Sequence, residues 1–510
     1  MEKSMKSDSI FQDEALPGDS SLVGYSHLVR KYGVQTYVRF PSCVSRAHVR
    51  GTVIRKAGWN IYDKRYWPGD KAMDHLVFAF KHESFDLMSL KRILDVLPQK
   101  EIEHYIQSSP TGIYARKIWF LYEWLKEAEL DLADCLKCQT IPLLDPEKYF
   151  ASRGVYSKRH RVKNNLLGFK QFSPTIRKTQ LLQEFVQSEL RDKIDVAIGK
   201  VGKSLIARAA SFMLLADSKA SFAIEGEIAP ANRIERWGKA VLQAGKFPLT
   251  QEEIVRLQKI IIKDTRFTHI GLRKEGVFLG ERDSEQNPLP EFIGASPDDL
   301  ESLIGTLVKT DTAIAADKLD PVLHAASIAF GFVYIHPLED GNGRLHRYLI
   351  HHVLAERGFS PRGLVFPISS SMLKYIDRYR EVLRNHSLPL MDFIEWETTG
   401  KKNVKVLNDT CDLYSSFDCT EACEFLYSCI KETIEKDLPE ELHYLKCHDR
   451  ALAAINKLVD IPDNMVKSLI IFVRQNNGVL PKKRRQREFA KLTDAEVKKI
   501  EHIIEKAFSA

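Results

Sequence analysis

Long hydrophobic runs are absent from this chain. Although 44% of its 510 residues are hydrophobic, no apolar stretch reaches the ~18 residues that a membrane-spanning helix requires. The first 20 residues are polar, contain Pro and Gly, and lack the apolar segment of a signal peptide. We therefore expect no membrane association, a mobile tail over residues 1–20 and a cytoplasmic location.

Cysteine is also sparse, with eight residues in the whole chain. This density is typical of reduced thiols in a cytosolic protein. Cys135 and Cys138 have the spacing of a zinc or redox motif, but no second Cys-x-x-Cys and no nearby pair of histidines completes a tetrahedral site. We therefore predict no zinc site there. The chain also has no internal repeat and no low-complexity tract.

The net charge is small, at +7 from 75 basic and 68 acidic residues, which excludes a strongly basic nucleic-acid-binding protein. One run, residues 481–487, concentrates five positive charges that can contact phosphates. No aromatic residue is interleaved with them to stack on bases. A solvated basic face is therefore the preferred interpretation, and nucleic-acid binding is the alternative.

The length exceeds what one core holds, so two to four domains are expected. After the tail, residues 21–190 mix strand-like and helical patterns with basic clusters around His160. They predict an α+β domain of unknown role that recognises a partner. Residues 191–400 predict a nearly all-helical core with one β-hairpin. Residues 401–510 predict helices that are loosely winged-helix-like, with a capping box at Thr493 and Glu496. The predicted fold class is mainly α.

The most informative segment is residues 336–344, His-Pro-Leu-Glu-Asp-Gly-Asn-Gly-Arg, followed by Arg347. An apolar run over 325–335 precedes it and a helical pattern over 347–357 follows, which predicts helix, tight loop, helix. A glycine-containing loop that leads into a helix N-terminus is an anion site, because backbone N–H groups and the helix dipole both point at the ligand. Two arginines on one face of the second helix favour a polyphosphate.

The residue types in this loop predict separate chemical roles. His336 is suited to remove a proton near neutral pH, and Pro337 takes it out of helical geometry. Asp340 is a hard oxygen ligand for Mg²⁺, which commonly takes one carboxylate together with substrate phosphates. The phosphate-binding set is predicted to be Gly341, Asn342, Gly343, Arg344 and Arg347.

This segment resembles the signature of the Fic family, His-Pro-Phe-x-Asp/Glu-Gly-Asn-Gly-Arg-x-x-Arg. It departs from the signature at Leu338, where the family usually has Phe and where an apolar side chain anchors the loop on the core. The resemblance implies transfer of AMP from ATP, with Mg²⁺, to a Ser, Thr or Tyr hydroxyl of a protein target. It implies that His336 is the general base and that Asp340 holds Mg²⁺. The kinase-like branch of the family has Lys at the position of Gly343, so glycine favours AMP transfer.

Ser221, Glu225 and Gly226 resemble a second family motif, the inhibitory Ser/Thr-x-x-x-Glu-Gly/Asn. They lie at the end of a helical pattern that begins near Val196, and Gly226 predicts a helix stop. The resemblance implies that Glu225 pairs with Arg347 and blocks the place of the γ-phosphate. Because this motif precedes the core in the same chain, it implies built-in inhibition.

Residues 271–280 contain short apolar runs between glycines and predict a β-hairpin, after which Pro288 and Pro290 predict a loop. In the Fic family such a hairpin holds the target peptide by strand addition. The resemblance therefore implies that a protein target docks on residues 271–280. Tyr375 and Tyr379 are adenine-side candidates by the same analogy, although packing is the preferred interpretation for both.

Two functional classes remain open. The first is an AMP-transferase that modifies protein targets, including itself. The second is a nucleotide-sensing regulator that binds DNA through residues 481–487 or a protein partner through residues 21–190. The first is favoured because a sensor needs no base at His336. Within the enzyme class, another donor nucleotide or removal of AMP, with Glu225 positioning water, stays open. The sequence leaves the target and a homo-oligomer undecided.

Overall fold

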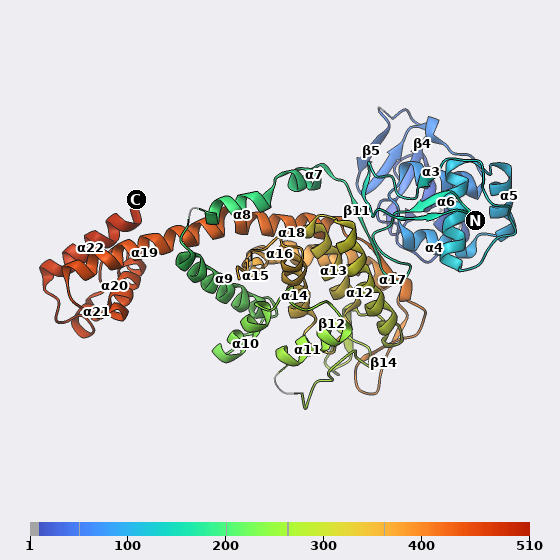
Figure 1. Ribbon diagram of the computed structural model, residues 1–510. Coiled ribbons are helices and arrows are strands. Elements are labelled where there is room, and N and C mark those ends of the chain that lie inside the picture. Colours follow the sequence, from blue (N-terminus) through green and yellow to red (C-terminus); the bar gives the residue numbers. More distant parts are fainter. Residues whose placement is uncertain (1–9, 50, 200, 263–264, 362, 510) are drawn as a thin grey trace. The chain divides into compact units, whose positions relative to one another are not determined.

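The computed structural model describes residues 10–49, 51–199, 201–262, 265–361 and 363–509. The chain forms two compact units, each assembled from separate stretches of sequence. The first unit comprises residues 1–187, 239–359 and 375–427, and the second comprises residues 188–238, 360–374 and 428–510. Helices predominate in both (Figure 1), so the predicted mainly α fold is confirmed. The domain boundaries near residues 190 and 400 stay predictions.

A four-stranded sheet and five helices form the first part of unit one (Figure 1). The strand order is β3-β4-β6-β5, with β4 parallel to β6 and the two outer pairs antiparallel. Sheet and helices share one core that contains the indole rings of Trp59 and Trp119. The elements are β3 Ser20–Leu22, α2 Gly24–Tyr32, β4 Ser42–Ser45, β5 Val53–Lys56, β6 Trp59–Tyr62, α3 Ala72–His82, α4 Leu87–Val96, α5 Gln99–Ser108 and α6 Ile113–Lys126.

The prediction of a mobile tail is wrong for residues 10–20. Strand β1 (Ile10–Phe11) pairs antiparallel with β2 (Glu14–Ala15), and β3 begins soon after. The Phe11 side chain is buried, and its ring centroid lies 6.2 Å from that of Trp59. One buried aromatic ring is enough to fix this polar segment to the core, because its apolar area is large. Residues 1–9 of the predicted tail lie outside the described residues.

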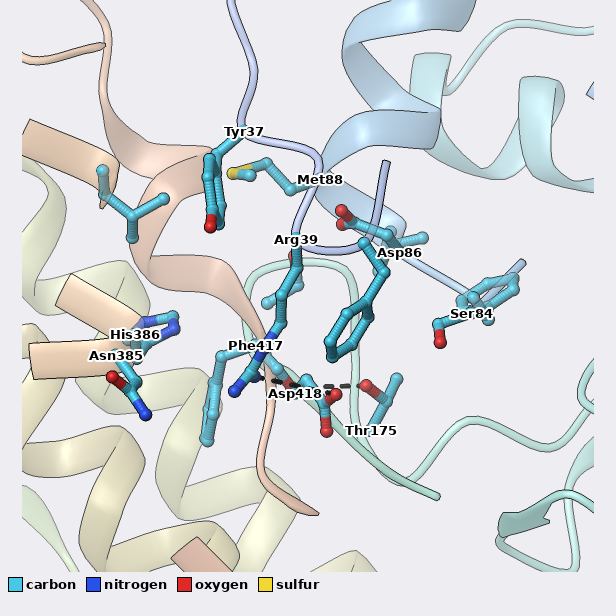
Figure 2. A pocket seen from close by; sticks show the side chains of 15 residues that line it. Tyr37, Arg39, Ser84, Asp86, Met88, Thr175, Asn385, His386, Phe417 and Asp418 are labelled. Carbon is cyan, nitrogen blue, oxygen red and sulfur yellow. Dashed lines mark hydrogen bonds and ion pairs between the residues drawn. The ribbon is translucent and has the colours of Figure 1, made fainter. Parts of the chain in front are cut away.

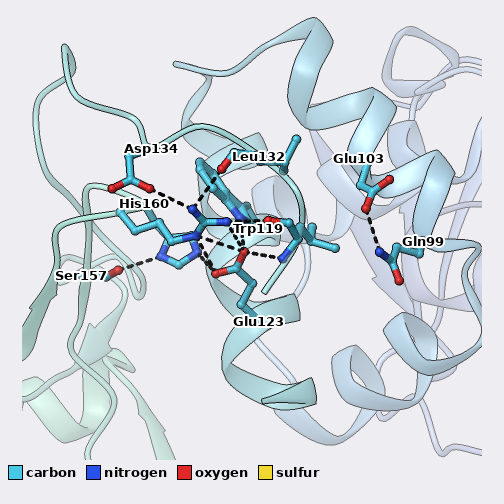
Figure 3. Close-up of polar contacts among 10 residues, drawn as sticks. Gln99, Glu103, Trp119, Glu123, Leu132, Asp134, Ser157 and His160 are labelled. Carbon is cyan, nitrogen blue, oxygen red and sulfur yellow. Dashed lines mark hydrogen bonds and ion pairs between the residues drawn. The ribbon is translucent and has the colours of Figure 1, made fainter. Parts of the chain in front are cut away.

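At the centre of the predicted basic cluster, His160 is buried and makes polar contacts within the domain (Figure 3). Arg159 pairs with Glu123 at 3.0 Å and with Asp134 at 2.8 Å, and its guanidinium lies 4.9 Å from the ring centroid of Trp119. His160 Nε2 lies 2.9 Å from Glu123 Oε2. Arg159 and His160 therefore hold a loop of the domain to α6 and are not part of a free basic surface, whereas Lys158 is exposed.

Two three-stranded sheets follow in unit one. Their orders are β7-β10-β9 and β8-β11-β16. The parallel pairing of β11 with β16 brings residues 173–175 beside residues 416–418. Their bounds are β7 Ile141–Pro142, β8 Tyr149–Phe150, β9 Val155–Ser157, β10 Val162–Asn164, β11 Ser173–Arg177 and β16 Ser416–Asp418.

Helix α13 (Pro321–Ile335) is the buried centre of the helical part of unit one. It begins where Asp320 accepts the N–H groups of Val322 and Leu323, with Pro321 in the first turn. The other helices of this part are α11 Gln251–Ile261, α12 Leu300–Asp317, α14 Asn342–Glu356, α16 Ile376–Ser387 and α18 Thr420–Glu432, the last of which continues into unit two. Of these, α12 and α14 pack directly on α13. Burial on every side explains why the α13 sequence is almost entirely apolar, and its buried polar side chains His324 and Ser327 are hydrogen-bonded to Asp311 and to Leu323 O.

The β-hairpin exists but lies later in the chain than predicted. Strand β12 (Phe278–Arg282) pairs antiparallel with β13 (Pro288–Ile293), and residues 271–277 form no strand. Pro288 and Pro290 therefore belong to a strand and not to a loop. A two-stranded ribbon tolerates them because each strand has a free edge, where a missing N–H donor breaks no ladder bond. A second hairpin, β14 (Trp396–Thr398) with β15 (Val404–Val406), was not predicted.

Unit two is helical. Its elements are α8 Leu190–Gly199, α9 Lys203–Ile224, α15 Ile368–Lys374, η4 Thr433–Asp437, α19 Leu438–Leu458, α20 Asp463–Gln475, α21 Lys482–Arg487 and α22 Asp494–Ser509. The capping box is confirmed, since Thr493 N–H donates to Glu496 Oε2 at 2.6 Å and Glu496 N–H donates to Thr493 Oγ1 at 3.2 Å. Residues 428–509 are all described and contain no strand, so the winged-helix likeness lacks its wing.

Two of the five charges in residues 481–487 serve packing. Arg485 donates to the carbonyl oxygen of Phe489 at 2.6 Å and also bonds that of Leu492. Arg484 pairs with Glu488, and its guanidinium lies 4.4 Å from the ring centroid of Phe472. The basic run therefore offers fewer charges to a phosphate backbone than the sequence suggests.

Cys135 and Cys138 are joined by a disulfide, which corrects the expectation that the cysteines are reduced. The other six cysteines are free thiols.

Within the described ranges, no helix combines the length and apolarity needed to cross a bilayer.

Candidate active site

His336 ends helix α13 in the left-handed conformation, with φ 55° and ψ 58°. This departure from helical geometry is the one predicted from Pro337. The His336 N–H still donates to Phe332 O at 3.0 Å, while its Nδ1 lies 3.2 Å from Val333 O. A carbonyl oxygen can only accept, so the proton belongs to Nδ1 and the lone pair to Nε2. The ring is 8% exposed and meets Phe292 edge-on, with 5.5 Å between centroids.

The loop after His336 is closed by the side chain of Asn342. Its Oδ1 accepts the N–H of Leu338 at 3.0 Å, and its Nδ2 donates to the carbonyl oxygen of Leu338 at 2.8 Å. Leu338 is fully buried, which confirms its predicted role as the anchor of the loop. The sequence predicted that Asn342 donates its amide to phosphate. The structure gives that amide a different contact, the loop backbone, and its role toward a nucleotide stays a prediction.

The backbone turn expected before α14 is present, while anion binding at this helix start stays a prediction. Gly341 precedes the helix with φ 99°, a conformation that favours glycine. The first N–H groups of α14, beginning at Asn342 and Gly343, have no partner within the helix and point outward from its N-terminal end. The side chains of Arg344 and Arg347 are both 2% exposed and are carried by this first part of the helix. The start of α14 thus carries backbone donors and two buried arginine side chains, six to eleven residues after His336 in the chain.

Asp340 keeps an accessible carboxylate at the edge of this loop. Its side chain is 51% exposed, and its Oδ1 accepts from Arg344 Nη2 at 2.9 Å. The neighbouring Glu339 is engaged differently, because its Oε2 accepts the N–H of His269 at 2.7 Å. One exposed carboxylate beside an anion site fits Mg²⁺, which usually takes one or two carboxylates plus phosphate oxygens. Among the described residues there is no group of three or more metal-ligating side chains.

The histidines that follow the motif are structural. His346 Nδ1 lies 2.8 Å from Ala329 O and ties α14 to α13. His352 is fully buried, its Nδ1 accepts the N–H of Gly245 at 3.3 Å, and burial lowers its pKa.

Tyr379 is 4% exposed and stacks on His346 with 5.9 Å between ring centroids. Packing is therefore its observed role, while Tyr375 remains 40% exposed at the start of α16.

Two residues beside this loop were not singled out from the sequence. Gln258 of α11 is fully buried; its Nε2 donates to Asp340 O at 3.3 Å, and its Oε1 accepts the N–H of Gly271 at 2.8 Å. Arg273, quoted only as part of the expected hairpin, is 4% exposed and bonds the carbonyl oxygen of His336. Both contacts bridge distant parts of the chain, so no local spacing signals them.

A separate cavity of about 90 Å³ in unit one includes no residue of the motif (Figure 2). Two of its charged lining residues are paired with residues outside the lining: Arg39 with Glu421 at 2.7 Å, and Asp418 with Arg177 at 2.9 Å. Burial lowers the pKa of His386 to about 3, so this lining ring is neutral at pH 7. The walls of the cavity are therefore mainly apolar, and the charged groups named here already have partners of opposite charge.

The predicted inhibitory segment ends helix α9 in unit two. Ser221 is fully buried, Glu225 is the exposed C-cap, and Gly226 has φ 73°. The N–H of Gly226 donates to Ala223 O at 3.0 Å and that of Glu227 donates to Phe222 O at 3.1 Å. These bonds form a Schellman motif, which confirms Gly226 as the helix stop. The pairing of Glu225 with Arg347 stays a prediction.

Comparison with known families matches residues 248–354 to the Fic/DOC family. The match includes α11, the β12–β13 hairpin and the loop from His336 into α14. A Fido domain-containing protein of Dictyostelium discoideum is 34% identical over 122 residues, which are 22% of this chain and 76% of that protein. The chain belongs to the Fic-domain family.

Other Fic-domain relatives are similar over different shares of their length. The protein adenylyltransferase Fic of Nematostella vectensis is 31% identical over 101 residues, which are 19% of this chain but only 23% of that protein. A solved Fic family protein from Desulfovibrio desulfuricans G20 has a TM-score of 0.37 at 17% identity, covering 56% of this chain and 82% of its own. A Fic domain containing signaling protein from Bacteroides thetaiotaomicron has a TM-score of 0.35 at 20% identity, covering 50% and 96%.

Proposed function

We propose that this Fic-domain protein is a transferase that moves AMP from ATP to a Ser, Thr or Tyr hydroxyl of a protein target. The observation that carries the proposal is the arrangement at His336. Val333 O holds the ring proton on Nδ1, so Nε2 is the nitrogen with the lone pair that would accept a proton from a target hydroxyl, and the proposed anion-binding start of α14 follows six residues later in the chain. A base beside a polyphosphate site is the combination that nucleotidyl transfer needs.

In the proposed reaction, the target hydroxyl gives its proton to His336 Nε2 while its oxygen attacks the α-phosphorus of ATP. The bond from the α-phosphorus to the bridging oxygen breaks, and pyrophosphate leaves. The backbone N–H groups of α14, with Arg344 and Arg347, stabilise the negative charge on the phosphates, so the protein contributes mainly positioning and electrostatics. Asp340 would hold Mg²⁺, an ion that neutralises phosphate charge.

The target is proposed to dock on the hairpin at its corrected position, residues 278–293. Four of the five residues of β12 are exposed, and a two-stranded ribbon leaves its outer edge free for strand addition. Self-modification is one form of this docking, and a homo-oligomer stays a prediction, as does the cytoplasmic location. Nucleic-acid binding is not proposed, because Arg484 and Arg485 are engaged in packing.

Built-in inhibition by Glu225 is part of the proposal. A carboxylate that pairs with Arg347 would occupy the place of the γ-phosphate and neutralise its partner. The same carboxylate would position water if the enzyme removed AMP instead, and a different donor nucleotide is the other variant within this class.

The test is labelling with α-³²P-ATP and Mg²⁺, comparing the parent, Glu225→Gly, and Glu225→Gly combined with His336→Ala. Label on protein in Glu225→Gly, and its loss with His336→Ala, is the expected result. Equal labelling of all three proteins would contradict both the base and the inhibition. No label with ATP binding retained would redirect the proposal to another donor, a missing target or a sensor.

A further inference from the structure

Arg273 is a buried arginine whose hydrogen bonds all go to backbone carbonyl groups. Its Nε donates to His336 O at 2.9 Å, its Nη1 to Glu275 O at 2.8 Å, and its Nη2 to Ala295 O. Its own N–H donates to Pro337 O at 3.0 Å. Burial lowers the pKa of the guanidinium to about 10, and within the described residues it forms no ion pair. The side chain remains charged at pH 7 inside a cage of carbonyl dipoles.

These carbonyl groups belong to the motif loop and to the segment after the hairpin, and the proposed reaction would depend on the relative position of these two segments. His336 and Pro337 form the start of the motif loop, whereas Ala295 directly follows the hairpin. The contact is tight: a Cβ at Gly294 would lie 3.0 Å from Arg273 Nη2 and 3.1 Å from His336 Cβ. The N–H of Ala295 also donates to Ile335 O at 3.1 Å. The guanidinium therefore fixes the base of the hairpin against the residue that carries the imidazole.

The segment that supplies Arg273 is itself held at the far end of the same loop. Gln258 binds Gly271 N–H and Asp340 O through its two amide atoms, at 2.8 Å and 3.3 Å. Residues 271–273 thus contact the first part of the motif loop directly through Arg273 and are linked to Asp340 through Gln258. A rigid brace of this kind limits how far either end of the loop can move relative to the hairpin.

We propose that Arg273 is a positioning residue that sets the distance between His336 Nε2 and a hydroxyl presented by the hairpin. This inference rests on the proposed function, because it assumes that a target lies along β12. A planar guanidinium can bind two carbonyl groups in fixed directions at once, which a lysine ammonium does not reproduce. A displacement of about 1 Å between base and hydroxyl is enough to lower turnover about 100-fold.

The experiment compares Arg273→Gln and Arg273→Lys in the Glu225→Gly protein, at saturating α-³²P-ATP. We expect Arg273→Gln to lower the maximal rate of protein labelling about 100-fold, with the KM for ATP changed less than threefold. The labelling rate of Arg273→Lys should lie between that of Arg273→Gln and that of the Glu225→Gly parent. The matched control is Arg116→Gln, since Arg116 is also a buried arginine that donates to carbonyl groups, those of Gln139 and Arg161, far from the motif in sequence. It should keep the parent rate.

A second readout makes the outcome independent of catalysis. Hydrogen exchange followed by mass spectrometry over residues 332–340 should be faster in Arg273→Gln than in Arg116→Gln. An unchanged labelling rate would overturn the proposal, as would a rate loss matched by an equal loss of ATP affinity. If the Glu225→Gly parent transfers no AMP, the failure concerns the donor, the target or the proposed function and not Arg273. Exchange then decides alone: selective acceleration at residues 332–340 supports the brace, and equal exchange in the two variants overturns it.

Discussion

Replacing Asn342 with Ala tests whether its side chain holds the motif loop. Asn342 is 3% exposed, and both of its hydrogen bonds go to Leu338, which is fully buried. The substitution leaves the N–H and C=O groups of Leu338 unsatisfied at about 1–3 kcal/mol each, so the sum is about 2–6 kcal/mol. Water entering beside the exposed Asp340 would recover part of this energy. We therefore expect the loop to lose about 2–4 kcal/mol of local stability.

Hydrogen exchange is the assay, because the lost free energy belongs to local opening of the loop. A loss of about 2–4 kcal/mol corresponds to exchange about 30- to 900-fold faster in peptides covering residues 336–341. The matched control is Asn385→Ala, since Asn385 is exposed and its amide bonds one carboxylate, that of Glu421, at 3.1 Å. That control should leave exchange of the loop unchanged.

Asn342→Asp separates the structural role from a charge effect. A carboxylate still accepts the N–H of Leu338 but cannot donate to its carbonyl oxygen, so exchange should rise less than in Asn342→Ala. The new negative charge lies in the first turn of α14, where a phosphate is proposed to bind, so affinity for a fluorescent ATP analogue should fall more than in Asn342→Ala. Asn342→Ala should therefore have the larger effect on hydrogen exchange, and Asn342→Asp the larger effect on affinity for the ATP analogue. Exchange within threefold of the parent in Asn342→Ala would refute the reasoning.

Three further outcomes follow from buried contacts. Leu338→Ala should cost about 2–5 kcal/mol of unfolding free energy, measured by urea denaturation, because a fully buried side chain is truncated; a change below about 1 kcal/mol would contradict the anchor role. Burial raises the pKa of Glu123, but hydrogen bonds led by those from Arg159 outweigh it and lower the pKa below its usual 4.5. The ionised form therefore stabilises the fold above pH 4.5, and the gap in melting temperature between the parent and Glu123→Gln should narrow as pH falls below that value; a constant gap would refute this. Arg485→Gln should lower the melting temperature of the C-terminal helices, whereas Arg487→Gln, at an exposed position, should not; equal losses would contradict the packing role of Arg485.

The motif could be predicted because its geometry is local. Residues 336–347 are consecutive, so a helix end, a turn and a helix start place His336, Asp340 and the start of α14 within one loop without help from the rest of the chain. The stop of α9 at Gly226 and the capping box at Thr493 were predictable for the same reason: each depends on residues at most five positions apart.

The errors arise where a distant partner outweighs local composition. Residues 10–20 are polar, yet Phe11 packs against Trp59 and orders them. Prolines normally end strands, yet β13 contains two, because its pairing with β12 leaves one edge free. The pairing of β11 with β16 joins segments about 240 residues apart, and no pattern within either segment specifies the other.

Arginine shows most clearly why a motif is not yet a site. In the sequence, Arg159, Arg485 and Arg273 carry the same charge as Arg344, and each lies in a segment that was assigned to partner, phosphate or target binding. In the folded protein, Arg159, Arg485 and Arg273 bind carboxylate or carbonyl groups of the chain. Arg344 differs from them in that it is buried beside the N-terminus of α14. The motif loop carries the proposed base, but its backbone at His336 is bonded to a guanidinium that lies more than 60 residues earlier in the chain. For this reason a variant that keeps the whole motif and changes Arg273 alone is expected to lose turnover while it keeps its affinity for ATP.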